Sequence, residues 1–479
     1  MSSSRAAGFL CVPVTLLIVA CGETGQPLRS AVSPVPQIVQ TPHRDLDVVL
    51  IVVDTLRADH VHCYGYGRET TPAIDALAAQ GTRFADCTAQ ASWTVPSMVS
   101  LLTSRRTVSD FVRLPAARTL ADVLHDAGYV TLGFQDNLLL APGAGFERGF
   151  DVYEMEVGSE RCEELLASTA GRPLFLYCHF VDPHAPYAPL PEFDVFGRDG
   201  GLQHFSDSAR RFSAYLQAQP GADDARDLDT TMDAASEVQE QVALYDGDVL
   251  QADQRVQYVL DLLARHGRRD RALVIVASDH GECLWEQPEA EAALADDARA
   301  DPLRRFKAGH NTLLAQSLVH VPLVMSGPDL PRGVVVDGPV ENVDIVPTIL
   351  DVLGLPAPEP RDGQSLMDLV QAAAEGGQAP GKDVVFSNSS LFTMARQRDG
   401  KKLVLPWDAG GPDPAQFLDL ALDPREQAPW PPSGGVSSTR LERLIAEMRA
   451  SALKGTEADT ALDDEPRARL QAMGYAGPR

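Results

Sequence analysis

The sequence predicts an α/β fold in which helices flank a mostly parallel central sheet, followed by a small C-terminal α+β subdomain. The segment from Asp47 to Val53 is a near-continuous run of β-branched and other apolar residues, which is typical of a strand covered on both faces. Similar runs alternate with segments of helical periodicity, which indicates a parallel sheet. The chain has 479 residues, 44% of them hydrophobic, and this is enough for one large domain or two unequal ones.

The other elements follow in chain order. The apolar residues after Tyr245 repeat every three or four positions and predict a helix that Gly267 ends. Similar patterns predict helices over 71–80, 98–103 and 119–127, and strands over 129–134, 174–181 and 272–277. Short strands over 384–386, 403–405 and 416–420 and a helix over 438–452 indicate the C-terminal subdomain. The polar stretches 195–235 and 286–305 are expected to be exposed loops that could border a site.

The N-terminus carries an export signal. Arg5 precedes an apolar stretch, residues 8–20, that is too short to span a bilayer. The stretch ends in Ile-Val-Ala-Cys21, which resembles the bacterial lipobox and implies a lipid on Cys21; the alternative is a plain secretory signal with a chance cysteine. We expect a lipoprotein signal peptide over 1–21, a tether over 22–45, a catalytic domain over 46–380, and a C-terminal subdomain with a helical tail over 381–479. The mature protein would then be exported and anchored to the membrane of the bacterial cell envelope.

The net charge limits the kinds of molecule that the surface of the protein can bind. The formal net charge is −26, so non-specific binding of nucleic acid is excluded as a function of the surface as a whole. An anionic ester remains a candidate substrate, because a bound cation can make a site locally positive.

Polar residues follow three of the predicted strands. Asp54 ends the first, the second runs into Asp182-Pro183-His184, and the third runs into Asp279-His280. In open parallel sheets ligands bind at the carboxyl ends of the strands. Carboxylates and imidazoles together are good ligands for a divalent cation such as zinc or manganese. A single aspartate after a strand is often only a cap, but three such endings in one chain favour a metal site.

Thr94 is the candidate nucleophile. It precedes Pro96, which suits the first turn of the helical run 98–103, so we expect Thr94 just before a helix N-terminus, where the dipole favours an anion. A threonine hydroxyl is a poor nucleophile unless a base or a metal activates it. The alternative role for Thr94 is an ordinary helix cap.

These residues belong to an ordered set of motifs that resembles the sulfatase-like family of the alkaline phosphatase superfamily. The matching runs, from about residue 46 to 430, are Val53-Asp54-Thr55-Leu56-Arg57-Ala58-Asp59-His60, Tyr64-Gly65-Tyr66-Gly67, Thr71-Pro72-Ala73-Ile74-Asp75-Ala76-Leu77-Ala78, Thr94-Val95-Pro96-Ser97, Leu101-Leu102-Thr103-Ser104-Arg105, Asp182-Pro183-His184-Ala185-Pro186-Tyr187, Ser278-Asp279-His280-Gly281-Glu282, Gly309-His310, Val321-Pro322-Leu323, Asp344-Ile345-Val346-Pro347-Thr348, Asp362-Gly363-Gln364-Ser365-Leu366 and Phe417-Leu418-Asp419-Leu420 with Asp423-Pro424.

The resemblance implies roles for individual residues. Asp54, Asp279 and His280 would bind a divalent metal ion, zinc or manganese, with calcium as an alternative. Thr94 would be both nucleophile and metal ligand. His184 and His310 would contact the oxyanion or the leaving group of the ester, and Lys307 could add positive charge; the alternatives are ordinary loop histidines and a solvated lysine.

The chain also departs from the family pattern. Sulfatases of this family mature a cysteine or serine to formylglycine within Cys/Ser-x-Pro-x-Arg. Here Thr94 replaces the cysteine and Met98 replaces the arginine, so formylglycine cannot form at this position. Thr55 replaces the second aspartate of the usual pair, which weakens the case for calcium. Threonine nucleophiles resemble the phosphodiesterase and phosphoglycerol transferase branches.

The sequence therefore predicts a metal-dependent hydrolase or transferase that acts on phosphate esters, of the phosphodiester or phosphoglycerol type, through a covalent phosphothreonine. One alternative is a sulfatase that works without formylglycine. The other is a non-catalytic lipoprotein that binds a glycan or an anion of the envelope.

Overall fold

The computed structural model describes residues 45–108, 111, 113–155, 160–197, 234–284, 310, 313–407, 415–426, 429 and 436–456. The predicted signal peptide with Cys21 and nearly all of the predicted tether lie outside these residues. Lys307, the stretch 286–305 and most of the stretch 195–235 also lie outside them. The predictions for these segments therefore stay predictions.

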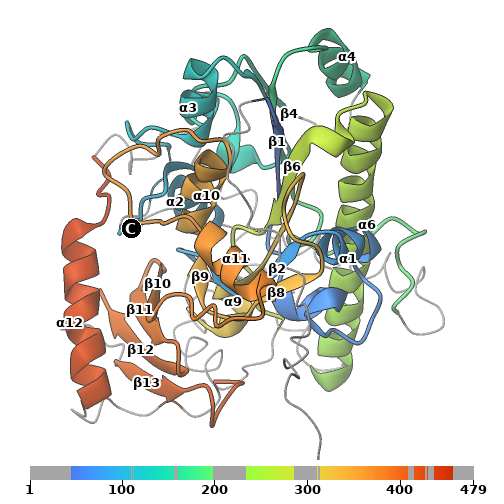
Figure 1. Cartoon of the computed structure of the whole chain (residues 1–479). Helices are drawn as coiled ribbons and strands as arrows, with labels where there is room; N and C mark the ends of the chain where they lie inside the picture. The colour runs from blue at the N-terminus through green and yellow to red at the C-terminus, as the bar shows by residue number, and fades with distance from the viewer. Residues whose placement is uncertain are drawn as a thin grey trace, which may run out of the picture. The chain divides into compact units, whose positions relative to one another are not determined.

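The central sheet has nine strands in the order β4-β3-β5-β1-β6-β7-β2-β8, with β9 paired to β2 (Figure 1). Strands β4, β3, β5, β1 and β6 run parallel, whereas β7 is antiparallel to both of its neighbours. The strands are β1 (Asp47–Val53), β2 (Thr82–Thr88), β3 (Val130–Gln135), β4 (Val152–Met155), β5 (Leu174–Phe180), β6 (Ala272–Ala277), β7 (His320–Ser326), β8 (Val334–Val336) and β9 (Val340–Glu341).

Helices cover both faces of this sheet, as the near-continuous apolar strands predict. In β1, Val48, Leu50 and Val52 face one apolar core, and the alternate residues face another. The first core contains α2, α3, α10 and α11, and the second contains α1, α4 and α6 (Figure 1). The helices are α1 (Pro72–Ala79), α2 (Thr94–Thr103), α3 (Leu120–Asp126), α4 (Glu160–Ser168), α6 (Ala234–Arg265), α9 (Gln316–Val319), α10 (Ile345–Val352), α11 (Met367–Ala374) and α12 (Val436–Ser451).

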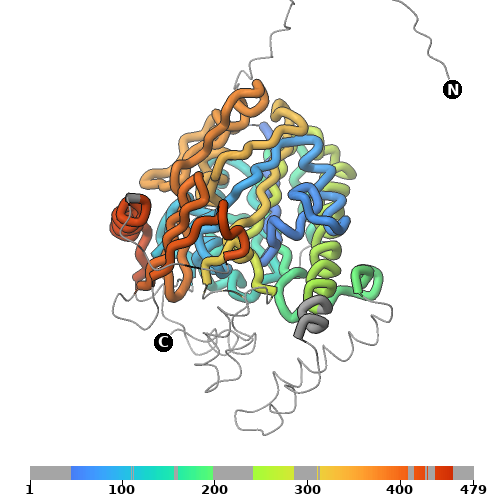
Figure 2. The backbone as a smooth tube through the Cα atoms, turned by 90° about the horizontal axis from the view of Figure 1, so that it is seen from below, coloured from blue at the N-terminus to red at the C-terminus, as the bar shows by residue number. Residues whose placement is uncertain are grey.

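A second, antiparallel sheet follows in the order β10-β11-β12-β13. Its strands are β10 (Val384–Asn388), β11 (Phe392–Gln397), β12 (Lys401–Pro406) and β13 (Gln416–Asp419). Apolar residues on one face pack against α12, and those on the other face pack against the segment around α9. Figure 2 shows the backbone of α12, in red, beside the strands of this sheet. Both sheets belong to one compact unit, and β10 of the second sheet contacts β2 and β9 of the central sheet.

The predicted fold class is confirmed: a mostly parallel central sheet lies between helices, and a separate antiparallel sheet follows it. Two local expectations were wrong. The helix placed after Tyr245 begins at Ala234, eleven residues earlier and inside a stretch expected to be a loop. Thr94 is the first residue of α2 and not the residue before it. None of the helices described here, α6 with its 32 residues included, is both long enough and apolar enough to cross a membrane.

Candidate active site

Three neighbouring strands bring the predicted ligands to one edge of the sheet. The strands β5, β1 and β6 are adjacent and parallel, so their carboxyl ends meet. Asp54 directly follows β1, and Asp279 and His280 follow β6 two and three residues after its end. All three side chains are fully buried. Residues more than 220 positions apart in the chain therefore form one cluster.

Thr94 faces this cluster from the first turn of α2. Its Oγ1 lies 3.3 Å from Nε2 of His280, and the residue is fully buried. The N-cap residue of α2 is Trp93, which is extended and makes no side-chain cap, so Thr94 does not act as the N-cap. Ser97, one turn further, donates from Oγ to the carbonyl oxygen of Asp279 at 2.5 Å and so ties α2 to the loop after β6.

Unpartnered carboxylate oxygens show that the cluster fits a cation. Oδ1 of Asp54 and Oδ2 of Asp279 are buried and have no hydrogen-bond partner among the described residues. They lie 3.5 Å and 3.4 Å from Nε2 of His280. Nδ1 of His280 lies 2.8 Å from the carbonyl oxygen of Gly281 and donates to it, so Nε2 keeps its lone pair. Two buried carboxylate oxygens without hydrogen-bond partners, next to the lone pair of an imidazole, are energetically unfavourable unless a cation binds between them. These three atoms suit a divalent metal ion.

Two members of the cluster escaped the sequence analysis. His179, within β5, places Nε2 3.2 Å from Oδ2 of Asp54, and Asn137 after β3 donates from Nδ2 to the same oxygen at 2.6 Å. Single ligand atoms of Asp54, His179 and Asp279 all lie within 4.8 Å of one another, so His179 is a further candidate ligand. His179 was hidden in an apolar strand, where a buried histidine gives no distinct signal.

The pKa values fit a site built for a positive ion. Burial raises the pKa of Asp279 well above its ordinary value, and the neighbouring carboxylate of Asp54 raises it further. Burial also opposes ionisation of Asp54, but the hydrogen bond from His179 and the nearby His280 hold its pKa below the ordinary range. Burial, with the nearby charge of His310, lowers the pKa of His280 to about 4, so its ring is neutral at pH 7. A bound metal ion would oppose this rise and favour the ionised form of Asp279.

The two other predicted histidines lie against the same cluster. The ring centres of His184 and His310 are 4.9 Å apart, and those of His310 and His280 are also 4.9 Å apart. Nδ1 of His310 lies 3.1 Å from Oε1 of the fully buried Glu282. Burial disfavours the imidazolium, but the carboxylate of Glu282 outweighs this effect and raises the pKa of His310. His310 therefore has a partner that favours a protonated, donating ring.

Helix α6 holds the loop that carries His184. Arg255 on α6 pairs with Asp182 at 2.7 Å, and Gln251 donates to the same carboxylate at 2.7 Å. Oδ2 of Asp248 accepts the backbone N–H of Ala188 at 2.9 Å. The long predicted helix thus positions a candidate catalytic residue that precedes it in the chain.

Asp248 provides a test of this anchoring. Burial, opposed by the hydrogen bond from Ala188, raises the pKa of Asp248 to about 8. An acid whose folded pKa is raised contributes stability below its unfolded pKa, near 4, and loses it as the pH rises through 8. We expect Asp248→Asn, which keeps the acceptor oxygen, to increase the free energy of unfolding relative to wild type by about 1 kcal/mol or more at pH 9 and by less at pH 5. Thermal or urea unfolding at both pH values measures this difference, and an equal effect at both would contradict the pKa.

Thr55 shows how the chain is bent at the site. Its φ of 57° lies in the left-handed region, which a β-branched residue rarely adopts. Its N–H donates to Oδ1 of Asp279 at 3.3 Å, and its carbonyl accepts the hydroxyl of Tyr245 at 2.8 Å. These two bonds hold the unusual conformation, which directs the chain away from Asp54 and leaves Asp279 Oδ2 for a ligand.

The fold and the donor set define an α/β protein with a candidate divalent-cation centre at the carboxyl edge of its parallel sheet. The model of the sulfatase family matches residues 47–355, well over half of the chain. The chain therefore belongs to the sulfatase family, within the alkaline phosphatase superfamily.

Curated relatives resemble parts of the chain. Mouse arylsulfatase K is 30% identical over 177 residues, which cover 35% of this chain and 27% of that protein. The multifunctional alkaline phosphatase superfamily protein PehA of Trinickia caryophylli is 27% identical over 239 residues, which cover 46% of this chain and 41% of that protein. The matched part thus spans less than half the length of either relative.

Solved structures share the fold over most of the chain. BT4656, solved with its substrate D-glucosamine-2-N,6-O-disulfate, has a TM-score of 0.63 at 17% identity and covers 85% of this chain and 98% of its own. The phosphonate monoester hydrolase SpPMH from Silicibacter pomeroyi has a TM-score of 0.59 at 20% identity, with coverage of 88% and 98%. At these identities the likeness concerns the fold alone.

Proposed function

We propose that the protein is a metal-dependent hydrolase or transferase of phosphate esters that uses Thr94 as its nucleophile. One observation carries the proposal: the Thr94 hydroxyl lies beside Nε2 of His280. The same Nε2 faces the carboxylate oxygens of Asp54 and Asp279 that have no hydrogen-bond partner among the described residues. A hydroxyl at this position shares the cation site instead of capping the helix. The first turn of α2 adds free N–H groups that favour the anionic group of an ester.

Asp54, Asp279, His280 and Thr94 would hold the metal ion, with His179 as a further ligand or as the group that orients Asp54. When bound, the ion would lower the pKa of the threonine hydroxyl and neutralise charge on the ester oxygens. Asn137 donates to Asp54 and lies 3.4 Å from Thr94 Oγ1, so it fixes the relative position of the carboxylate and the hydroxyl.

The reaction would proceed in two displacements. Thr94 Oγ1, its proton released to solvent, attacks phosphorus and the bond to the leaving alcohol breaks, which gives a phosphothreonine. His310 or His184 gives a proton to the departing oxygen. Water, or the hydroxyl of an acceptor, then attacks the same phosphorus and gives its proton to that histidine, and the bond from phosphorus to Thr94 Oγ1 breaks.

A change of leaving group tests the role of His310. For an alkyl phosphodiester, His310→Ala should lower kcat by about 10²–10⁴-fold, because the departing alkoxide needs a proton. For a 4-nitrophenyl diester the loss should be several-fold smaller, because that phenolate leaves without a proton. The matched control His62→Ala removes an exposed histidine that pairs with Asp75 and should change neither rate. Equal losses on both substrates would exclude His310 as the acid.

Threonine favours phosphorus over sulfur as the reaction centre, since the family route to sulfate esters needs formylglycine. A sulfatase that acts without formylglycine is the second candidate, supported by the family match and by the arylsulfatase relatives. Paired assays decide between them: methyl 4-nitrophenyl phosphate against 4-nitrophenyl sulfate, each with zinc, manganese or calcium. We expect turnover of the phosphodiester. Turnover of the sulfate ester alone would show that the protein is a sulfatase and not a phosphodiesterase. If neither ester is turned over and the purified protein contains no metal, a non-catalytic binding lipoprotein is favoured.

We also propose that Cys21 carries the lipid that anchors the protein to the bacterial envelope. The support is the sequence around Cys21, which lies outside the described residues. The wild-type protein should fractionate with membranes and incorporate labelled palmitate. Cys21→Ser should lose the label, and a labelled Cys21→Ser protein would contradict the anchor site.

A further inference from the structure

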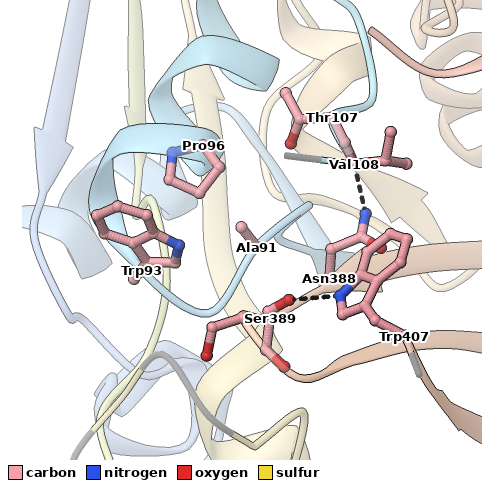
Figure 3. Close-up of a pocket in the computed structure, with 9 residues that line it drawn as sticks. Ala91, Trp93, Pro96, Thr107, Val108, Asn388, Ser389 and Trp407 are labelled. Atoms are coloured by element: carbon pink, nitrogen blue, oxygen red, sulfur yellow. Dashed lines mark hydrogen bonds between the residues drawn. The ribbon is translucent and has the colours of Figure 1, made fainter. Parts of the chain in front are cut away.

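A pocket of about 150 Å³ lies between the start of α2 and the second sheet (Figure 3). Trp93 and Pro96, two of its lining residues, flank Thr94 in the chain, so the pocket begins within one helical turn of the candidate nucleophile. The far wall comes from the end of β10 and from Trp407, which follows β12. None of its lining residues carries a charged side chain; they are Ala91, Trp93, Pro96, Thr107, Val108, Asn388, Ser389, Ser390 and Trp407.

Hydrogen bonds fix two walls of the pocket. Nε1 of Trp407 donates to the carbonyl oxygen of Ser389 at 2.9 Å, and Nδ2 of Asn388 donates to the carbonyl oxygen of Thr107 at 2.7 Å (Figure 3). The guanidinium of Arg449 lies 4.2 Å from the centre of a Trp407 ring and supports it. The indole and the amide are therefore held in place before any ligand binds.

Two further polar atoms of the same pocket have no partner among the described residues. They are the N–H donor Nε1 of Trp93 and the acceptor Oδ1 of Asn388, each on a side chain that is 6% exposed. Figure 3 shows the indole nitrogen of Trp93 turned toward the other lining residues. A buried donor or acceptor without a partner is costly, so such pairs mark places where a ligand or water completes the bonding.

The chemistry of the walls selects the class of ligand. An orphaned donor and an orphaned acceptor match hydroxyl groups, and an indole matches the apolar face of a ring. A cavity with no ionised side chain favours an uncharged group. A carbohydrate ring combines these properties, whereas a flat apolar ring would leave both polar atoms unpaired.

We propose that this pocket is a subsite for a sugar, the alcohol portion of the ester whose anionic group reacts at Thr94. The proposal rests on the proposed function for the position of the reacting group. Trp93 and Asn388 would then determine which alcohol is accepted, and the second sheet would contribute directly to specificity.

The first test of the pocket measures sugar binding by a protein that lacks the proposed nucleophile. The Thr94→Ala protein is titrated with methyl β-D-glucoside by saturation-transfer NMR. We expect binding that the added change Trp93→Phe, which removes the N–H and keeps an aromatic ring, weakens at least 5-fold. Adding Tyr258→Phe on α6 instead is the matched control and should leave the affinity unchanged. No binding, or equal binding with Trp93→Phe, would overturn the subsite.

The second test of the pocket compares kcat/KM for a sugar ester and a simple ester. Two phosphodiesters are compared, methyl glucose-6-phosphate and methyl 4-nitrophenyl phosphate. Trp93→Phe and Asn388→Ala should each lower kcat/KM for the glucose ester about 10-fold more than for the simple ester, because each leaves a sugar hydroxyl unpaired. Equal losses on both esters would overturn the subsite. If no ester is turned over, the proposed function is wrong. The titration still shows whether the pocket binds a sugar.

Discussion

Replacement of Thr94 by alanine should lower kcat/KM by about 10⁴-fold or more while the protein stays folded. In the proposed mechanism the hydroxyl is both the attacking group and a ligand of the cation, so its loss would remove the covalent step and one ligand together. Steady-state kinetics on methyl 4-nitrophenyl phosphate measure the loss, and thermal unfolding checks the fold. The remaining ligands would still hold the cation, and through it the anionic ester, so KM should change much less than kcat.

Two controls separate the hydroxyl from its surroundings. Thr94→Ser keeps the nucleophile and should retain activity within about one order of magnitude of wild type. Thr103→Ala removes another buried hydroxyl from the last residue of α2, where it bonds to the carbonyl oxygen of Val99, and should cost little activity. If Thr94→Ala turned over substrate as fast as Thr103→Ala, the assignment of the nucleophile would be wrong.

The second large effect concerns the metal ion. Asp54→Asn and Asp279→Asn each remove one anionic oxygen that has no other partner among the described residues. Each variant should lose most of its bound metal and at least about 10³-fold in kcat/KM, since a catalytic cation contributes several kcal/mol. Inductively coupled plasma mass spectrometry measures the metal, and added zinc or manganese should rescue the variants only partly.

Asp47 is the matched control for Asp54. It is a fully buried aspartate at the opposite end of the same strand, where it pairs with Arg268 at 2.9 Å. Asp47→Asn should lower stability but leave the metal content unchanged. Equal loss of metal from Asp47→Asn and Asp54→Asn would show that the loss follows from damage to β1 and not from removal of a ligand.

Much of the architecture could be predicted from the sequence because burial leaves a clear pattern. The run at β6 is apolar throughout and that at β1 is apolar after Asp47, and their bounds in the structure are those predicted. Strand β2 was missed because polar residues interrupt it, as in Thr-Arg-Phe-Ala-Asp-Cys-Thr. The early start of α6 was missed because its first residues lie in a polar stretch without periodicity.

The candidate site could be predicted in part for a similar reason. Residues just after the ends of strands, such as Asp54 and Asp279, are brought to one edge by the regular geometry of a parallel sheet. Asn137 and His179 contribute through side-chain direction, which no linear motif records. Glu282 appeared in a motif, but the motifs do not show that it contacts His310, 28 positions further along the chain.

The departures from the family pattern lie at the centre of the site. Met98 stands on α2 where sulfatases have an arginine, and it is fully buried in the apolar core instead of contacting an anion. Thr55 stands where a second aspartate is usual, and its Oγ1 has no partner among the described residues. The remaining donors make a smaller and less anionic set, which is consistent with a single divalent ion.

The most direct measurement is an anomalous diffraction map of crystals grown with manganese, recorded for wild type and for Thr94→Ala. We expect one strong peak within about 2.5 Å of oxygen or nitrogen atoms of Asp54, Asp279 and His280, with Thr94 Oγ1 against it in the wild type. A map with no peak there, or with the ion bound elsewhere and Thr94 turned away from it, would contradict the shared cation on which the mechanism depends.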